Sequence, residues 1–354
     1  AYLRRTKEFE TIGRQKLRAQ VQQTLKALSQ QSQEAAGEVL DQLVESKKIS
    51  ELEYHWIVNG FTCRIKRDHL EELETVPGVR MIYLAGQAIN RQNLRLPPAT
   101  APSEPVMTPP GKFSPEQFES PWYVAKLKAD QVWKKHGVTG KGVLNVIHDG
   151  NFILSPNILV NRYRNAKEDL NDQDDSGNGL VDDLHGYDFF LRRANLTRTP
   201  MPKGGRVNAG VLHGHQCVAI ICGRGTKESP HRFGLAPESQ WAGVIAMQRI
   251  EAAIEWAVEQ GADTYSMSFS RPNLREYRSH WRKVMEHGAY CGIHFVSGAG
   301  NFAQEGRPSF APIPVQMRVP EDIPNVVFAA AGVQRDLSRT PFSSQGPVEW
   351  KTQH

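Results

Sequence analysis

Apolar residues in the first ninety positions recur at helical spacing and then in short, strand-like runs. Two apolar sets return every three or four residues and predict helix: Leu17, Val21, Leu25 and Leu28, then Val39, Leu40, Leu43 and Val44. Strand-like segments follow at Tyr54–Val58, Phe61–Ile65 and Met81–Leu84, and the stretch DHLEELETVPGV between the last two is helix-like. This order predicts a small α+β module over residues 1–90.

From residue 121 onward, strand-like and helix-like segments alternate. Buried strands are predicted in the runs GVLNVIHDG, WAGVIAM, DTYSMSFS, YCGIHFVSGAGN and VVFAAAGV, with helices at Glu251–Gln260 and Tyr277–Glu286. The alternation predicts an α/β fold with a doubly wound, mostly parallel sheet over residues 121–354, whose functional residues follow the carboxyl ends of strands. Residues 91–120 contain seven prolines and are interpreted as a linker between the two domains.

Composition narrows the class of protein. The chain has 354 residues, of which 39% are hydrophobic and 23% charged, which excludes a wholly disordered chain. The sequence contains no run of 18 apolar residues, the length that a membrane-spanning helix needs. The charge balance of 43 − 38 = +5 is spread along the chain, so we expect no nucleic-acid partner. Four widely spaced cysteines are interpreted as free thiols (Cys63, Cys217, Cys222 and Cys291).

The order of several segments resembles that of the subtilisin-like serine proteases, the subtilases. The segments are PWYVAKLKADQVWKKHGVTGKGVLNVIHDG, LHGHQCVAII, GLAPESQ, EWAVEQGADTYSMSFS, FVSGAGN and PFSSQGPVEW, and they cover about residues 121–350. The resemblance implies a subtilisin-like fold, peptide-bond hydrolysis by an Asp/His/Ser triad, a polypeptide substrate and no required cofactor. It also implies that residues 1–90 are an inhibitory propeptide. Subtilases are typically secreted, but the N-terminus lacks a signal peptide, so the compartment stays open.

Four positions match functional residues of this family. His213 opens the segment HGHQC and matches the catalytic histidine, a base suited to acyl transfer near neutral pH. Asn301 matches the asparagine of the oxyanion hole, which would donate to the developing negative charge. Ser268 and Phe269 lie where the family pairs a strand edge with extended substrate.

Two positions near the predicted site depart from the family pattern. Counting back eight residues from Pro156 places His148 at the position of the catalytic aspartate, with Asp149 one residue later. Either a local slip lets Asp149 orient His213, or the orienting carboxylate is lost; we favour loss, since neighbouring strand residues point to opposite faces. His215 stands where the family has a small threonine.

The family's Gly-Thr-Ser motif, which carries the nucleophile, does not occur in the sequence. We therefore interpret the chain as the N-terminal portion of a subtilase, truncated before its serine and inactive alone, with its own C-terminal fragment as a partner. The alternative is a pseudoprotease that serves as a binding or scaffold domain for a protein partner. A third hypothesis is a metal site of three imidazoles, from His148, His213 and His215.

The segment NDQDDSGNGLVDDLHGYDF is rich in carboxylates and turn glycines. Such a composition is typical of sites for hard cations such as calcium, although the spacing is not that of an EF-hand. The predicted ligands of a structural calcium ion are Asp172, Asp174, Asp182 and Asp183. A loop that keeps its shape without metal is the alternative.

Overall fold

The computed structural model describes residues 13–85, 121–198, 210–225, 233–246, 249–271, 276–303 and 317–346, together with Ser114, Leu274 and Val348. These residues form two compact units, which are described separately. The first unit contains the described residues up to 85 and those within 248–259 and 273–293, which include the helices α7 and α8; the second unit contains the other described residues. The expected linker over 91–120 lies outside the described residues apart from Ser114, so the predicted division into domains stays a prediction.

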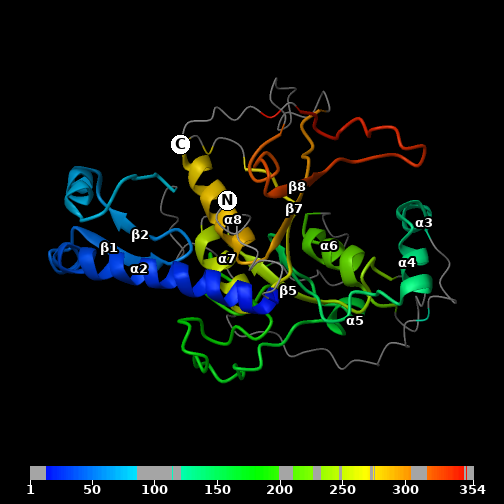
Figure 1. Cartoon of the computed structure of the whole chain (residues 1–354), viewed down its shortest axis with the longest axis horizontal. Coiled ribbons are helices and arrows are strands. Elements are labelled where there is room, and N and C mark those ends of the chain that lie inside the picture. Colours follow the sequence, from blue (N-terminus) through cyan, green and yellow to red (C-terminus); the bar gives the residue numbers. More distant parts are fainter. Residues whose placement is uncertain are drawn as a thin grey trace. The chain divides into compact units, whose positions relative to one another are not determined.

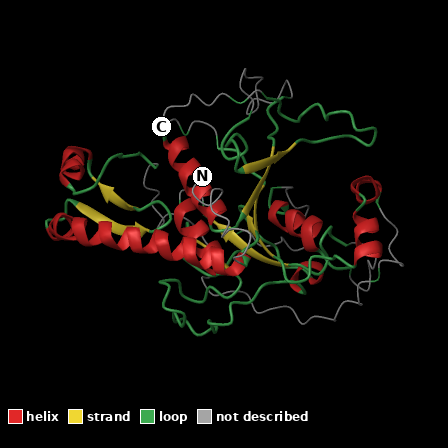
Figure 2. Cartoon of the chain, in the orientation of Figure 1, coloured by secondary structure: helices red, strands yellow, loops and turns green. Residues whose placement is uncertain are grey.

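The N-terminal part of the first unit packs a helix against a two-stranded hairpin (Figures 1 and 2). It consists of α2 (Arg14–Glu45), β1 (Ile49–His55), β2 (Gly60–Ile65) and the 3-10 helix η2 (Arg67–Thr75). β1 and β2 are antiparallel. Their core is one apolar cluster: Ala36, Leu40, Leu43, Ile49, Leu73 and Val76. Of the two predicted apolar sets of this helix, Leu40 and Leu43 are deeply buried, whereas Leu28 and Val44 are exposed, because only one face of α2 meets the hairpin.

The same unit includes two helices from the second half of the chain, α7 (Ile250–Glu259) and α8 (Tyr277–Tyr290). Polar contacts hold the N-terminal module against α7. The Ile57 amide donates to Glu255 Oε1 at 2.9 Å, and the buried His55 Nδ1 lies 3.5 Å from Glu255 Oε2. Arg249, just before α7, pairs with Glu53 of β1. The N-terminal module therefore docks on α7 through charged groups withdrawn from water.

The second unit is built on a six-stranded sheet in the order β4-β5-β3-β6-β7-β8, in which each adjacent pair of strands is parallel. Its strands are β3 (Leu144–His148), β4 (Gly186–Asp188), β5 (Gln240–Ile245), β6 (Thr264–Met267), β7 (His294–Gly298) and β8 (Val327–Ala330). The chain adds strands on one side of β3 and then crosses to the other side. The predicted doubly wound α/β fold is confirmed, and its topological switch lies at β3, where such folds place their sites.

Four helices complete the described part of this unit: α3 (Trp122–Leu127), α4 (Ala129–His136), α5 (Pro156–Leu159) and α6 (His213–Cys222). α6 packs beside β3 and β5 because its residues Val218 and Cys222 are apolar and fully buried. They join a core of aromatic and aliphatic side chains that includes Phe152, Trp241 and Ile245. None of the helices in the described ranges is long and apolar enough to cross a membrane.

Three local expectations differ from the structure. The segment Met81–Leu84 forms no strand, and Leu84 is 85% exposed. The helix-like stretch after residue 67 is a 3-10 helix that ends before Pro77, since proline disfavours helix in the preceding residue. β4 has only three residues and was not predicted, because it is too short to show an alternating pattern.

Candidate active site

Asp149 and His213 come from two elements that the core holds together. Asp149 follows the last residue of β3, and its amide still donates to Val244 O of the neighbouring strand β5 at 3.0 Å. His213 is the first residue of α6, whose apolar side is fixed in the core by Val218. Both side chains are thus positioned by regular structure rather than by a free loop.

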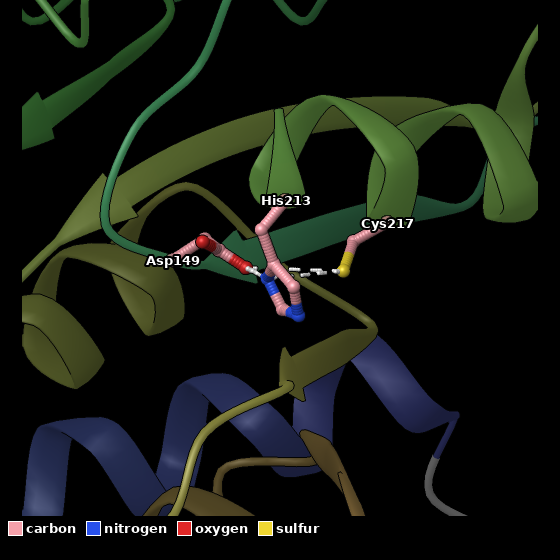
Figure 3. A group of neighbouring side chains, drawn as sticks. All are labelled: Asp149, His213 and Cys217. Atoms are coloured by element: carbon pink, nitrogen blue, oxygen red, sulfur yellow. Dashed lines mark hydrogen bonds and ion pairs between the residues drawn. The ribbon is translucent and has the colours of Figure 1, made fainter. Parts of the chain in front are cut away.

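The carboxylate and the imidazole form a short hydrogen bond. Asp149 Oδ2 lies 2.6 Å from His213 Nδ1, while Asp149 Oδ1 accepts from the Gly150 amide at 2.7 Å. The Asp149 side chain is only 7% exposed, whereas that of His213 is 44% exposed. Figure 3 shows the second ring nitrogen of His213 pointing away from Asp149. The bond fixes the ring and leaves Nε2 available to another group.

A thiol lies beside this pair. Cys217 is one helical turn after His213 on α6, and its Sγ is 3.9 Å from His213 Nδ1 and 3.8 Å from Asp149 Oδ2 (Figure 3). Hydrogen bonding to Asp149, followed by that to Cys217, raises the pKa of His213 to about 10, and partial burial opposes the shift. The carboxylate therefore stabilises the imidazolium, which is what an orienting residue does for a catalytic histidine.

The structure corrects the register that places His148 opposite His213. His148 is buried: its Nε2 accepts from the Ala246 amide at 3.2 Å, and its Nδ1 lies 3.1 Å from the Tyr265 hydroxyl. Burial lowers the pKa of His148 to about 3, with added repulsion from Arg271 and Arg198. Neighbouring strand residues do point to opposite faces, but the face toward α6 is that of Asp149. The count from Pro156 fails because it crosses a loop, where spacing can change by one residue.

Gly214 is required by the close approach of α6 to the segment after β3. A Cβ at this position would lie 2.4 Å from Asn151 O and 3.1 Å from Asp149 Cβ. We expect Gly214→Ala to lower the free energy of unfolding by about 2 kcal/mol through overpacking, measured by urea denaturation. Gly150→Ala is the matched control, because a Cβ there meets nothing within 4 Å and should change stability by less than about 0.5 kcal/mol. Equal losses in both variants would contradict this explanation.

The other predicted site residues follow the carboxyl ends of neighbouring strands. Ser268 comes directly after β6 and is exposed, and the ring of Phe269 packs at 4.6 Å from that of His148. Asn301 is exposed in the loop after β7. Because β3, β6 and β7 are adjacent and parallel, these residues share one edge of the sheet with Asp149. The structure brings Asp149 and His213 into contact, while the roles of Ser268, Phe269 and Asn301 stay predictions.

Ser344 holds the loop that carries Asn301. Its amide donates to Gly300 O at 2.9 Å, and its Oγ accepts from the Phe302 amide at 3.0 Å. Ser344 is buried and lies far along the chain from residue 301, so nothing in the sequence pattern pointed to this contact. Cys217 was also missed, although its spacing of four residues from His213 places both on one face of a helix.

The carboxylates of the acidic segment are engaged within their own loop. Asp174 accepts from the amides of Gly177, Asn178 and Gly179, and Asp182 accepts from those of Asn171 and Asp172. Asp183 accepts from the side-chain amides of Asn165 and Asn178. Within the described ranges, the predicted calcium ligands do not gather into a group with ligand geometry. These hydrogen bonds support the loop from within, and calcium binding by it stays a prediction.

The three-imidazole hypothesis is not supported by the positions of the rings. His215 Nδ1 lies 2.9 Å from Ile153 O, His148 contacts Tyr265, and His213 contacts Asp149. Each ring thus has its own partner on a different segment. The group of potential metal ligands found among the described residues is Asp149, His213 and Cys217.

Comparison with known proteins agrees with the resemblance in the motifs. Residues 198–353 match the model of the subtilase family, Peptidase_S8, and this range includes His213 and Asn301 but begins after Asp149. The resemblance to subtilases is thereby confirmed, and it supports a serine-protease lineage. No curated protein matches the chain in sequence.

Solved structures with a similar chain path include MycP1 and a leader peptide processing protease. MycP1 from the ESX-1 type VII secretion system is 17% identical, with a TM-score of 0.42 over 72% of this chain and 69% of that chain. The epidermin leader peptide processing serine protease EpiP from Staphylococcus aureus is 12% identical, with a TM-score of 0.49 over 86% and 69% of the two chains. Similarity this low assigns neither a substrate nor an activity to this chain.

Proposed function

We propose that this chain supplies the aspartate and histidine of a subtilisin-like serine endopeptidase. The observation that carries the proposal is the 2.6 Å hydrogen bond between Asp149 Oδ2 and His213 Nδ1 at the carboxyl edge of β3. The carboxylate is almost fully withdrawn from water, while the histidine is open on its other side. A buried carboxylate that fixes one ring nitrogen and leaves the other exposed is the arrangement of a catalytic base.

In the proposed reaction, a serine hydroxyl on the Nε2 side of His213 attacks the scissile carbonyl carbon. Its proton passes to Nε2, while Nδ1 keeps its proton and its bond to Asp149. The tetrahedral intermediate carries its negative charge on the carbonyl oxygen, toward which Asn301 would donate. His213 then gives the Nε2 proton to the leaving amine, and water hydrolyses the acyl-enzyme through the same proton transfers.

The high pKa of His213 sets the expected pH dependence of this activity. With a pKa of about 10, the ring is an imidazolium at neutral pH, and a general base needs the neutral ring. Turnover is therefore expected to increase from neutral toward alkaline pH.

Residues 13–85 have a role consistent with a propeptide in this proposal. They are fastened to α7 by Glu255 and Arg249, whose partners Ile57, His55 and Glu53 are all near the end of β1. Contacts of this kind hold the module in place without a covalent bond, so cleavage of the connecting chain would allow its release.

The test is labelling of the naturally expressed protein by a fluorophosphonate probe, which reacts with activated serines. We expect labelling of one serine at a rate that falls at least about 1,000-fold in His213→Ala. His215→Ala is the control, because His215 is on the same helix but contacts Ile153 O, and its labelling should persist. Absence of labelling in the natural protein would support an inactive binding domain instead.

A further inference from the structure

The side chains of Asp149, His213 and Cys217 place an oxygen, a nitrogen and a sulfur atom around one point. Figure 3 shows all three side chains directed toward the same space between α6 and the end of β3. The Sγ lies 3.8 Å from Asp149 Oδ2 and 3.9 Å from His213 Nδ1, and the oxygen and nitrogen are 2.6 Å apart. These three residues are a group with potential metal-ligand geometry within the described chain.

The distances are close to those of a tetrahedral zinc site. Bond lengths of about 2.3 Å to sulfur and about 2.0–2.2 Å to nitrogen or oxygen imply ligand atoms about 3.4–3.6 Å apart. The two distances to sulfur need to shorten by only a few tenths of an ångström. The Asp149–His213 distance must open by somewhat less than 1 Å, which a rotation of the half-exposed His213 ring can supply.

The chemistry of the ligand set selects a borderline or soft cation. A thiolate and an imidazole favour Zn²⁺ or Cd²⁺ over Ca²⁺ or Mg²⁺, which prefer oxygen ligands. The Asp149 carboxylate adds negative charge, and its Oδ1 is held by the Gly150 amide, so Oδ2 is directed at the cation position. Cys217 is only partly buried and forms no disulfide. Three protein ligands leave a fourth position for water.

We propose that Asp149, His213 and Cys217 form an inhibitory binding site for a zinc-like divalent cation. Binding breaks no covalent bond other than the S–H bond of Cys217 and the N–H bond at His213 Nδ1, and both protons go to solvent. No electron is transferred. Because the cation takes the Nδ1 lone pair, His213 loses its hydrogen bond to Asp149. The inhibitory consequence rests on the proposed function, whereas the binding itself does not.

The test is titration of the 354-residue chain with Cd²⁺, followed by thiolate-to-metal charge-transfer absorbance and by calorimetry. We expect one cation bound with a charge-transfer band. Cys217→Ser should abolish the band and weaken binding by roughly 100-fold or more, and Asp149→Asn should weaken it by roughly tenfold. Cys63→Ser is the matched control, because Cys63 is also a half-buried free thiol and has no role in this site.

Two outcomes would overturn the proposal: a band that survives in Cys217→Ser, or a band that disappears in Cys63→Ser. The binding measurement is independent of catalysis. Cadmium binding without fluorophosphonate labelling of the natural protein would keep the metal site and reject the proposed function. Labelling that persists in the presence of a saturating cation would reject the inhibitory part alone.

Discussion

Asp149→Asn is expected to lower the kcat of the natural protein by about 10⁴-fold, with little change in KM. The asparagine side chain has almost the same shape, but its NH₂ group can donate to His213 Nδ1. The ring proton then moves to Nε2, where it blocks the nitrogen that must accept a proton from serine. The fold is preserved, so the loss would reflect the wrong tautomer of the base rather than unfolding.

Peptide hydrolysis by wild type and variant, at several substrate concentrations, measures this effect. Asp172→Asn is the matched control: Asp172 is exposed in the acidic loop, and its backbone φ of 60° is tolerated by asparagine. Its activity should equal that of the wild type. If Asp149→Asn keeps normal turnover while His148→Gln loses it, the assignment of Asp149 as the orienting residue is wrong.

The sequence predicted the sheet and the histidine better than the carboxylate. His213 was selected because its segment resembles that of the subtilase histidine, and the glycine and apolar helical residues that follow it pack α6 against the core. The choice between His148 and Asp149 depended on the orientation of β3 relative to α6. Periodicity places two neighbouring strand residues on opposite faces, but it does not say which face the helix covers.

Contacts between segments far apart in the sequence account for the site features that the sequence did not predict. Cys217 was interpreted as a free thiol, which it is, but its closeness to Asp149 depends on where β3 ends relative to α6. The acidic loop shows a limit of predictions made from amino-acid composition. Its composition predicts calcium ligands, and in the structure turn amides also donate to Asp174 and Asp182 within the loop. Composition alone does not distinguish carboxylates that bind metal from carboxylates that cap turns.

The buried His148 makes stability sensitive to acid. In the folded protein its Nε2 accepts a hydrogen bond from the Ala246 amide, so a proton on this nitrogen would face an N–H group. Arg271 and Arg198 add repulsion against a charged ring, and Tyr265 and Phe269 enclose it. The folded pKa is about 3, compared with the ordinary value of 6.5. Only the unfolded chain binds the proton between these two values.

Stability is therefore expected to fall as pH decreases below 6.5, and the decline from this group ends near pH 3. The slope approaches about 1.4 kcal/mol per pH unit once the unfolded imidazole is protonated, so His148 removes about 2 kcal/mol between pH 6.5 and about pH 4.5. His148→Gln keeps an acceptor for the Ala246 amide but does not titrate, so its free energy of unfolding should decline less steeply. Urea denaturation across this pH range measures both profiles, and carboxylates common to both proteins cancel in the difference.

His136→Gln is the control, because His136 is exposed at the end of α4 and its replacement should leave the wild-type profile intact. If wild type and His148→Gln lose stability in parallel on acidification, the imidazole at position 148 is not the group that couples folding to pH.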